Sequence, residues 1–180
     1  MLDDVRGLHL FAQGRRPRLR NMMWGTTRDL GVAVFDYTYT VGSGKHQHTH
    51  SQTVVRFLAA GLDLPAFALR PESFWHKVGQ LFAGPDIDFD THPKFSRAYL
   101  LKGKNEAAVR GVFRDYVLDY FEDSPGLSVE AAGSRVVFYR ADTRAEPAAV
   151  RALLEQGFEV LALFRPTAAA NQSPPPDVEQ

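Results

Sequence analysis

Three histidines alternate along the segment HQHTH, at His46, His48 and His50. On a β-strand, side chains two residues apart project from the same face, about 6.6 Å from one another. Imidazole nitrogens in this arrangement bind zinc when a further ligand joins them. A second polar segment, DIDFDTH, places Asp86 and Asp88 on one side of an extended stretch. If the two segments met, their nitrogens and carboxylates would form a site for zinc or another divalent metal. Otherwise the histidines are only the solvated face of a hairpin.

The GSGK residues before the histidines resemble part of a phosphate-binding loop. That loop needs a glycine, four residues and then Gly-Lys-Ser/Thr at the start of a helix. Here Tyr39 stands five positions before Gly44, His46 replaces the hydroxyl residue, and the residues that follow are typical of a strand. We therefore expect no nucleotide cofactor. Instead, Gly42 and Gly44 are expected to adopt the positive φ angles of a hairpin loop.

The composition of the 180-residue chain excludes several function classes. The chain contains no cysteine, which rules out disulfides, thiolate zinc sites and a cysteine nucleophile. It has 21 basic and 21 acidic residues, so no overall charge favours nucleic acid as a partner. One basic run, GRRPRLRN, spans Arg15 to Arg20. We interpret it as a solvated turn leading into a strand; the alternative is contact with phosphates or acidic lipid headgroups.

Recognisable catalytic and membrane signals are missing from the sequence. It contains no Gly-x-Ser-x-Gly elbow, no His-Glu-x-x-His pair and no dinucleotide fingerprint. No stretch approaches the roughly 20 apolar residues that span a bilayer. The first residues lack the basic and apolar regions of a signal peptide. These features predict a soluble, cytoplasmic protein and favour a non-enzymatic role over an enzyme.

Hydrophobic alternation predicts two β-hairpins. The first joins residues 30–41 to 49–59, and the second joins residues 127–131 to 134–140, where Glu130 is expected at an outward position. One face of the first strand collects apolar residues, namely Ala33, Phe35, Tyr37, Tyr39 and Val41. A further strand is expected in SRAYLLKG, residues 96–103.

Three segments have helical spacing. An apolar stripe predicts an amphipathic helix over residues 105–122, with Asn105 as its N-cap. A final helix is expected from about Glu146, with Phe158 and Leu161 facing inward. A short helix after Pro71 would present Phe74, Val78 and Leu81.

Together these elements predict one α+β domain over residues 1–165. Its mainly antiparallel sheet is built from hairpins, and two main helices and one short helix pack on it. Residues 166–180 are rich in proline and alanine, and we expect this tail to be disordered.

Four segments resemble an uncharacterised bacterial protein family over residues 7–164: FDYTYTVGSGKHQHTHSQTVVRF, LPAFALRPESFWHKVG, DIDFDTHPKFSRAYLLKG and AAVRGVF. The family pattern keeps the GSGK and DIDF elements but not the histidine triplet, which weighs against a metal site. The resemblance implies structural roles for these residues: Gly42, Gly44, Pro71, Glu72, Asp86 and Asp88. It implies no catalytic residue, because the family has no established activity. Some members carry membrane-spanning helices before this domain, and this sequence shows none.

Three functional hypotheses remain from the sequence. The first is a non-enzymatic interaction or accessory module with a protein partner. The second is a binding protein for a small apolar or lipid-like ligand, held between sheet and helices by the many aromatic residues. The third is a metal-dependent hydrolase with His46, His48 and His50 as ligands, and Asp86 or Asp88 to activate water.

Overall fold

The computed structural model describes residues 7–75 and 86–165. The expected tail, residues 166–180, and the expected helical positions Val78 and Leu81 lie outside the described residues. In chain order the elements are η2 (His9–Ala12), β1 (Arg15–Thr26), β2 (Leu30–Val41), η3 (Gly44–His46), β3 (His48–Ala59), β4 (Leu64–Pro71), α1 (Glu72–Trp75), α2 (Pro93–Ala98), β5 (Tyr99–Gly103), α3 (Glu106–Val112), α4 (Asp115–Asp123), β6 (Ser128–Gly133), β7 (Arg135–Tyr139), η4 (Pro147–Ala149) and α5 (Val150–Leu163).

The seven strands form one sheet in the order β1-β2-β3-β7-β6-β4-β5, and every neighbouring pair is antiparallel. The α+β class and both predicted hairpins are therefore confirmed. Within the first hairpin, Tyr39 lies opposite His50 and Tyr37 lies opposite Gln52. Gly42 and Gly44 have φ angles of 77° and 56°, and a 3-10 turn followed by a strand comes next, so the loop is a hairpin connection and not a phosphate cradle.

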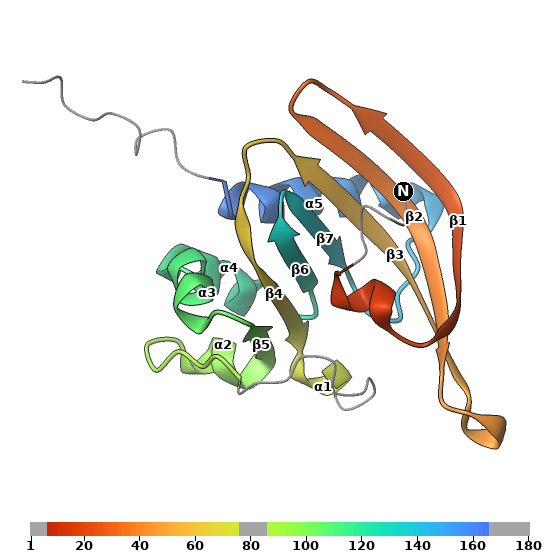
Figure 1. Cartoon of the computed structure of the whole chain (residues 1–180), viewed down its shortest axis with the longest axis horizontal. Helices are drawn as coiled ribbons and strands as arrows, with labels where there is room; N and C mark the ends of the chain where they lie inside the picture. Colours follow the sequence, from red (N-terminus) through yellow and green to blue (C-terminus); the bar gives the residue numbers. More distant parts are fainter. Residues whose placement is uncertain (1–6, 76–85, 166–180) are drawn as a thin grey trace, which may run out of the picture.

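The sheet has two differently covered faces. On the helical face, residues such as Val55 and Phe57 pack with α2–α5 into the larger core. On the opposite face, which we call the N-terminal face, Phe35 and Tyr37 pack with Leu8 and Leu10 of the N-terminal segment. Figure 1 shows α5 on one side of the sheet and η2 on the other. Because both faces are covered, alternation along these strands does not separate buried from exposed positions.

The basic run is a strand and not the solvated turn that its sequence suggested. Arg15 is the first residue of β1, an edge strand that pairs with β2 along its length. Its register shifts twice, next to Arg16 and next to Asn21, and both residues have positive φ angles of 54° and 50°. Pro17 lies within the first shift, a position where an edge strand tolerates proline. Charge and irregularity of this kind keep an edge strand from pairing with other chains.

The single helix predicted over residues 105–122 is two helices, α3 and α4. Asn105 caps α3 as expected, because its side chain accepts a hydrogen bond from the Ala108 amide at 3.1 Å. The helical backbone ends at Phe113, whose buried ring packs against Phe67 at a centroid distance of 5.0 Å. Gly111 weakens the helix just before this point. The break lets the apolar stripe continue in α4 while the Phe113 ring enters the core.

Helix α5 approaches β3 closely through a buried glycine. A Cβ atom at Gly157 would lie 3.2 Å from the Phe57 ring and 3.3 Å from Val55. Leu161 is buried as predicted, whereas Phe158, expected to face inward, is 41% exposed and meets the Phe57 ring in a tilted contact with 5.2 Å between centroids. The face of α5 that meets the sheet is therefore centred on Gly157, and Phe158 lies at its rim.

We expect substitution of this glycine to destabilise the protein. Gly157→Leu would lower the free energy of unfolding by about 1–3 kcal/mol, because the added atoms overpack the contact with β3. Gly111→Leu is the matched control: Gly111 lies in α3 with no atom within 4 Å of its Cβ position. This change would raise stability by roughly 0.5–1 kcal/mol through better helix propensity. Urea unfolding of both variants measures the difference, and equal effects would contradict the close approach of α5.

Candidate functional site

The structure separates the two polar segments that the metal hypothesis brought together. Asp86 forms an ion pair with Lys102 of β5, with 3.2 Å between Oδ1 and Nζ, and the Asp88 carbonyl accepts a hydrogen bond from Arg110. Strand β5 is at the far edge of the sheet, and β3 with the histidines is four strands away. The prediction that Asp86 and Asp88 complete a histidine site is therefore wrong. Alternation could not show this, because it does not give the order of the strands.

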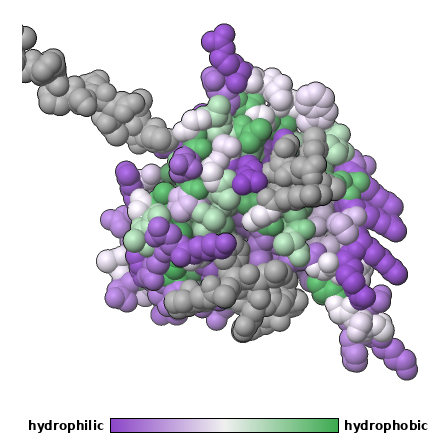
Figure 2. Space-filling view, in the orientation of Figure 1, coloured by the Kyte–Doolittle hydropathy of each residue, from purple (hydrophilic) through white to green (hydrophobic). Residues whose placement is uncertain are grey.

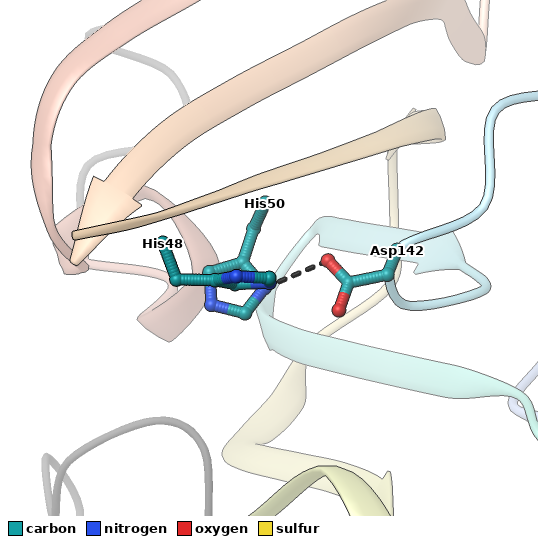
Figure 3. A group of neighbouring side chains, drawn as sticks. All are labelled: His48, His50 and Asp142. Carbon is teal, nitrogen blue, oxygen red and sulfur yellow. Dashed lines mark hydrogen bonds and ion pairs between the residues drawn. The ribbon is translucent and has the colours of Figure 1, made fainter. Parts of the chain in front are cut away.

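Only two of the three histidines point toward a common site. His46 is the last residue of the 3-10 turn η3 and is exposed, so it does not continue the alternation of the strand. His48 and His50 lie on β3, with their rings in edge contact at a centroid distance of 4.5 Å. The third group is Asp142, from the turn after β7 (Figure 3). One ligand atom from each of His48, His50 and Asp142 lies within 4.8 Å of the others.

Asp142 is held in place by the turn that carries it. Its carboxylate Oδ1 lies 2.7 Å from His50 Nδ1, and its backbone has a positive φ of 55°. Two hydrogen bonds join the turn to Thr53 of β3, one through its backbone and one through its side chain. The Thr53 amide donates to the Thr143 carbonyl at 3.0 Å, and the Ala145 amide donates to the Thr53 hydroxyl at 2.9 Å. No sequence pattern points to this residue as a ligand, because Asp142 is 92 positions from His50 and belongs to no motif.

His50 is buried, with 3% of its surface exposed. Its ring stacks on Tyr39 at a centroid distance of 5.0 Å. Its Nε2 atom is inaccessible to solvent and makes no hydrogen bond with any described residue. A buried ring nitrogen in this state costs stability, which makes His50 the most unusual member of the group.

A second polar cluster lies deeper on the N-terminal face, around the buried carboxylate of Glu130. Arg70 donates to Glu130 Oε1 at 2.5 Å and Tyr139 donates to the same oxygen at 3.1 Å. The backbone amide of Leu10, in η2, donates to Oε2 at 2.9 Å. The expected outward position of Glu130 is therefore wrong. The N-terminal segment covers this face, and the carboxylate is 1% exposed.

The N-terminal segment also bonds to the tyrosines of β2. The Tyr39 hydroxyl donates to Gln13 Oε1 at 3.0 Å, and Gln13 Nε2 lies 2.7 Å from His9 Nδ1. Burial, aided by the positive charge of Arg70, lowers the pKa of His9 to about 4. Burial likewise raises the pKa of Tyr37 to about 12. His9 is therefore neutral at physiological pH.

A groove lies on the helical face, between the β1–β2 ribbon and the start of α5. It has a volume of about 1140 Å³ and is lined by apolar and charged side chains, among them Met22, Met23, Val34, Pro147 and Val150. At one end, Asp36 accepts hydrogen bonds from Asn21, Thr53 and Arg144 at 2.7–2.8 Å. Burial alone would raise the pKa of Asp36, but the hydrogen bonds from Thr53, Asn21 and Arg144 outweigh it and lower the pKa below its ordinary value. Asp36 is thus a fixed negative charge at the end of the groove.

Beyond Asp36 and Arg144 the groove adjoins a smaller basic pocket of about 240 Å³. Arg18, Arg20, Thr38 and Thr49 complete its lining. Figure 2 shows hydrophilic side chains along the edge that β1 forms.

No protein-family model, curated protein or solved structure matches this chain. The family resemblance seen in the sequence therefore stays an interpretation, and function is argued from geometry. In residues 7–75 and 86–165, no helix combines the length and apolar character needed to cross a membrane.

Removing the charge of Glu130 is expected to destabilise the protein strongly. In Glu130→Gln, the buried Arg70 would lose the charge of its ion-pair partner, at a cost of about 3–5 kcal/mol. Glu106→Gln is the matched control, because the Glu106–Arg110 ion pair is exposed on α3 and such pairs contribute only about 0.3–0.5 kcal/mol. Chemical unfolding measures both. A loss of less than about 1 kcal/mol for Glu130→Gln would show that Arg70 has access to water.

The low pKa of His9 predicts a loss of stability in mild acid. The unfolded chain binds a proton at His9 below about pH 6.5, whereas the folded protein binds it only near pH 4. The unfolded state is therefore favoured progressively as pH falls through this window. The stability difference between wild type and His9→Gln should be constant above about pH 6.5 and should shrink toward pH 4. Unfolding at a series of pH values tests this, and a pH-independent difference would contradict the burial of a neutral imidazole.

Proposed function

We propose that this domain binds a single-chain anionic amphiphile, such as a long-chain fatty acid, in the groove between the β1–β2 ribbon and α5. The observation that carries the proposal is the pairing of a partly apolar groove with arginines that form no ion pair within residues 7–75 and 86–165. This belongs to the non-enzymatic class that the sequence favoured, with a lipid-like ligand in place of a protein partner.

The apolar part of the groove suits an alkyl chain. Its volume of about 1140 Å³ lies slightly above the range of about 300–1,000 Å³ that is typical of pockets for small ligands. Met22 and Met23 are 42% and 54% exposed, although they are large apolar side chains. Clustered apolar exposure on an otherwise polar edge is typical of a binding surface. Methionine suits such a site, because its flexible side chain adapts to ligands of irregular shape.

The basic pocket suits an anionic headgroup. Arg18 lies opposite Thr38 and Arg20 lies opposite Asp36 in the β1–β2 register, so both project onto the helical face. Asp36 is already bonded to Arg144, and neither Arg18 nor Arg20 makes an ion pair with any residue that the structure describes. A carboxylate or phosphate placed here would accept charge-assisted hydrogen bonds from guanidinium groups and threonine hydroxyls.

A protein partner that adds a strand to the sheet is less well supported. Such a partner would pair with the free edge of β1. Two register shifts and Pro17 interrupt that edge, and its arginines would be brought against the added strand.

Titration calorimetry with dodecanoate below its micelle concentration tests the proposal. We expect one dodecanoate per chain, and weaker binding of dodecanol, which lacks the charge. Met23→Ser should weaken dodecanoate binding about tenfold by removing apolar contact. The double variant Arg18→Gln with Arg20→Gln should remove the preference for dodecanoate over dodecanol.

Two variants serve as controls. Leu58→Ser removes an apolar side chain that is 38% exposed and is not part of the groove lining, and Arg16→Gln removes a β1 charge outside the basic pocket. Both should bind dodecanoate like wild type. Equal losses in the controls and the groove variants would refute the site. Binding to anionic vesicles but not to dissolved dodecanoate would identify a membrane surface as the ligand instead.

A further inference from the structure

We infer that His48, His50 and Asp142 form a binding site for one divalent transition metal of the zinc class. The site lies on the N-terminal face at the start of β3, whereas the proposed amphiphile groove is on the helical face. It differs from the site expected from the sequence in two ways: His46 is not a ligand, and the carboxylate comes from Asp142.

The donor set selects the class of metal. Two imidazole nitrogens and one carboxylate oxygen are typical ligands of zinc and of cobalt, nickel and copper, whereas calcium and magnesium prefer oxygen alone. Ligands bound tetrahedrally at about 2.0–2.2 Å from zinc lie roughly 3.3–3.6 Å apart. The ligand atoms here lie within 4.8 Å of one another, and the closest contact that involves Asp142 is 2.7 Å. These separations lie on either side of the spacing that a shared ion requires, so the three groups are placed as candidate ligands of one metal.

The second observation that points to a ligand is the state of His50. Only 3% of the surface of His50 is exposed, and its Nε2 has no hydrogen-bond partner among the described residues. Its other nitrogen is bonded to the Asp142 carboxylate. Coordination would give the buried imidazole of His50 a further polar partner and would offset part of the cost of burying it.

The surroundings hold the ligands in place before any metal binds. The His50 ring stacks on Tyr39, whose hydroxyl is bonded to Gln13 of the N-terminal segment. Asp142 belongs to a turn that is hydrogen-bonded to Thr53 through Thr143 and Ala145. Such outer contacts orient ligands and raise metal affinity.

His48 is exposed, so the site opens to solvent on one side. Three protein ligands leave a fourth position for water or for a donor from another molecule. Asp86 and Asp88 do not reach this position, which separates the site from the hydrolase that the sequence suggested.

Titration of the full chain, purified without a histidine tag, with Co²⁺ tests the inference. The absorption bands of Co²⁺ report the geometry of its ligands, and competition with Zn²⁺ gives the zinc affinity. We expect one Co²⁺ per chain, displacement by Zn²⁺, and a rise in Tm when Zn²⁺ is added. His48→Ala and Asp142→Asn should each weaken binding by at least the roughly 10- to 100-fold that follows loss of a supporting group. Circular dichroism would confirm that both variants fold.

His46→Ala is the matched control, because it removes a histidine from the same hairpin but not from the cluster. It should bind Co²⁺ like wild type. An equal loss in His46→Ala would show that the exposed hairpin binds metal non-specifically, and unchanged binding in Asp142→Asn would show that no three-ligand site exists. Either result overturns the inference. Absence of Co²⁺ binding at micromolar concentration in wild type also overturns it. The groove variant Met23→Ser should leave Co²⁺ binding unchanged, so failure of one proposal does not affect the other.

Discussion

A carboxylate that is removed from water must be paired, and Glu130 meets this requirement with donors from three distant parts of the chain. Arg70 comes from β4, Tyr139 from β7 and the Leu10 amide from η2. The amide contact places the N-terminal segment over the sheet and so buries Leu8 and Leu10 against the aromatic residues of β2. The same segment brings Gln13 to the Tyr39 hydroxyl. The Tyr39 ring in turn stacks on the ring of His50. The orientation of the histidine site thus depends on a charge at the centre of the sheet.

The helical face is stabilised mainly by close packing of apolar side chains. Helix α5 reaches β3 through Gly157, and the ring of Phe113, between α3 and α4, packs against Phe67 of β4. This cover leaves a groove at the β1–β2 ribbon, bordered by Met22, Met23 and the first turn of α5. At its end, the Asp36 carboxylate accepts hydrogen bonds from Asn21, Thr53 and Arg144. The groove therefore combines apolar side chains on both walls with charged ones, among them the fixed carboxylate of Asp36.

Local sequence patterns predicted what depends on local geometry. The hairpins, the glycine loop and the Asn105 cap all follow from the period of the strand or from the backbone bonds of a helix end. The errors arose where long-range packing decides. Glu130 alternates like an outward residue, yet a segment 120 positions away covers it. Asp142 reaches His50 only because β7 lies next to β3, an order that the sequence does not state. The alternation of the three histidines suggests one continuous strand, but the 3-10 turn that ends at His46 interrupts it.

The turn after β7 contributes a charged side chain to each face of the sheet. Asp142 points to His50 on the N-terminal face, whereas Arg144, two residues later, bonds to Asp36 on the helical face. Between them, the Thr143 carbonyl accepts from the Thr53 amide, and the Thr53 hydroxyl donates to Asp36. Thr53 is therefore the fixed point about which the turn is built, because both its backbone and its side chain are engaged. A displacement of the turn large enough to separate Asp142 from His50 would strain the bond between Arg144 and Asp36. One short turn therefore sets the position of Asp142 on one face of the sheet and of Arg144 on the other.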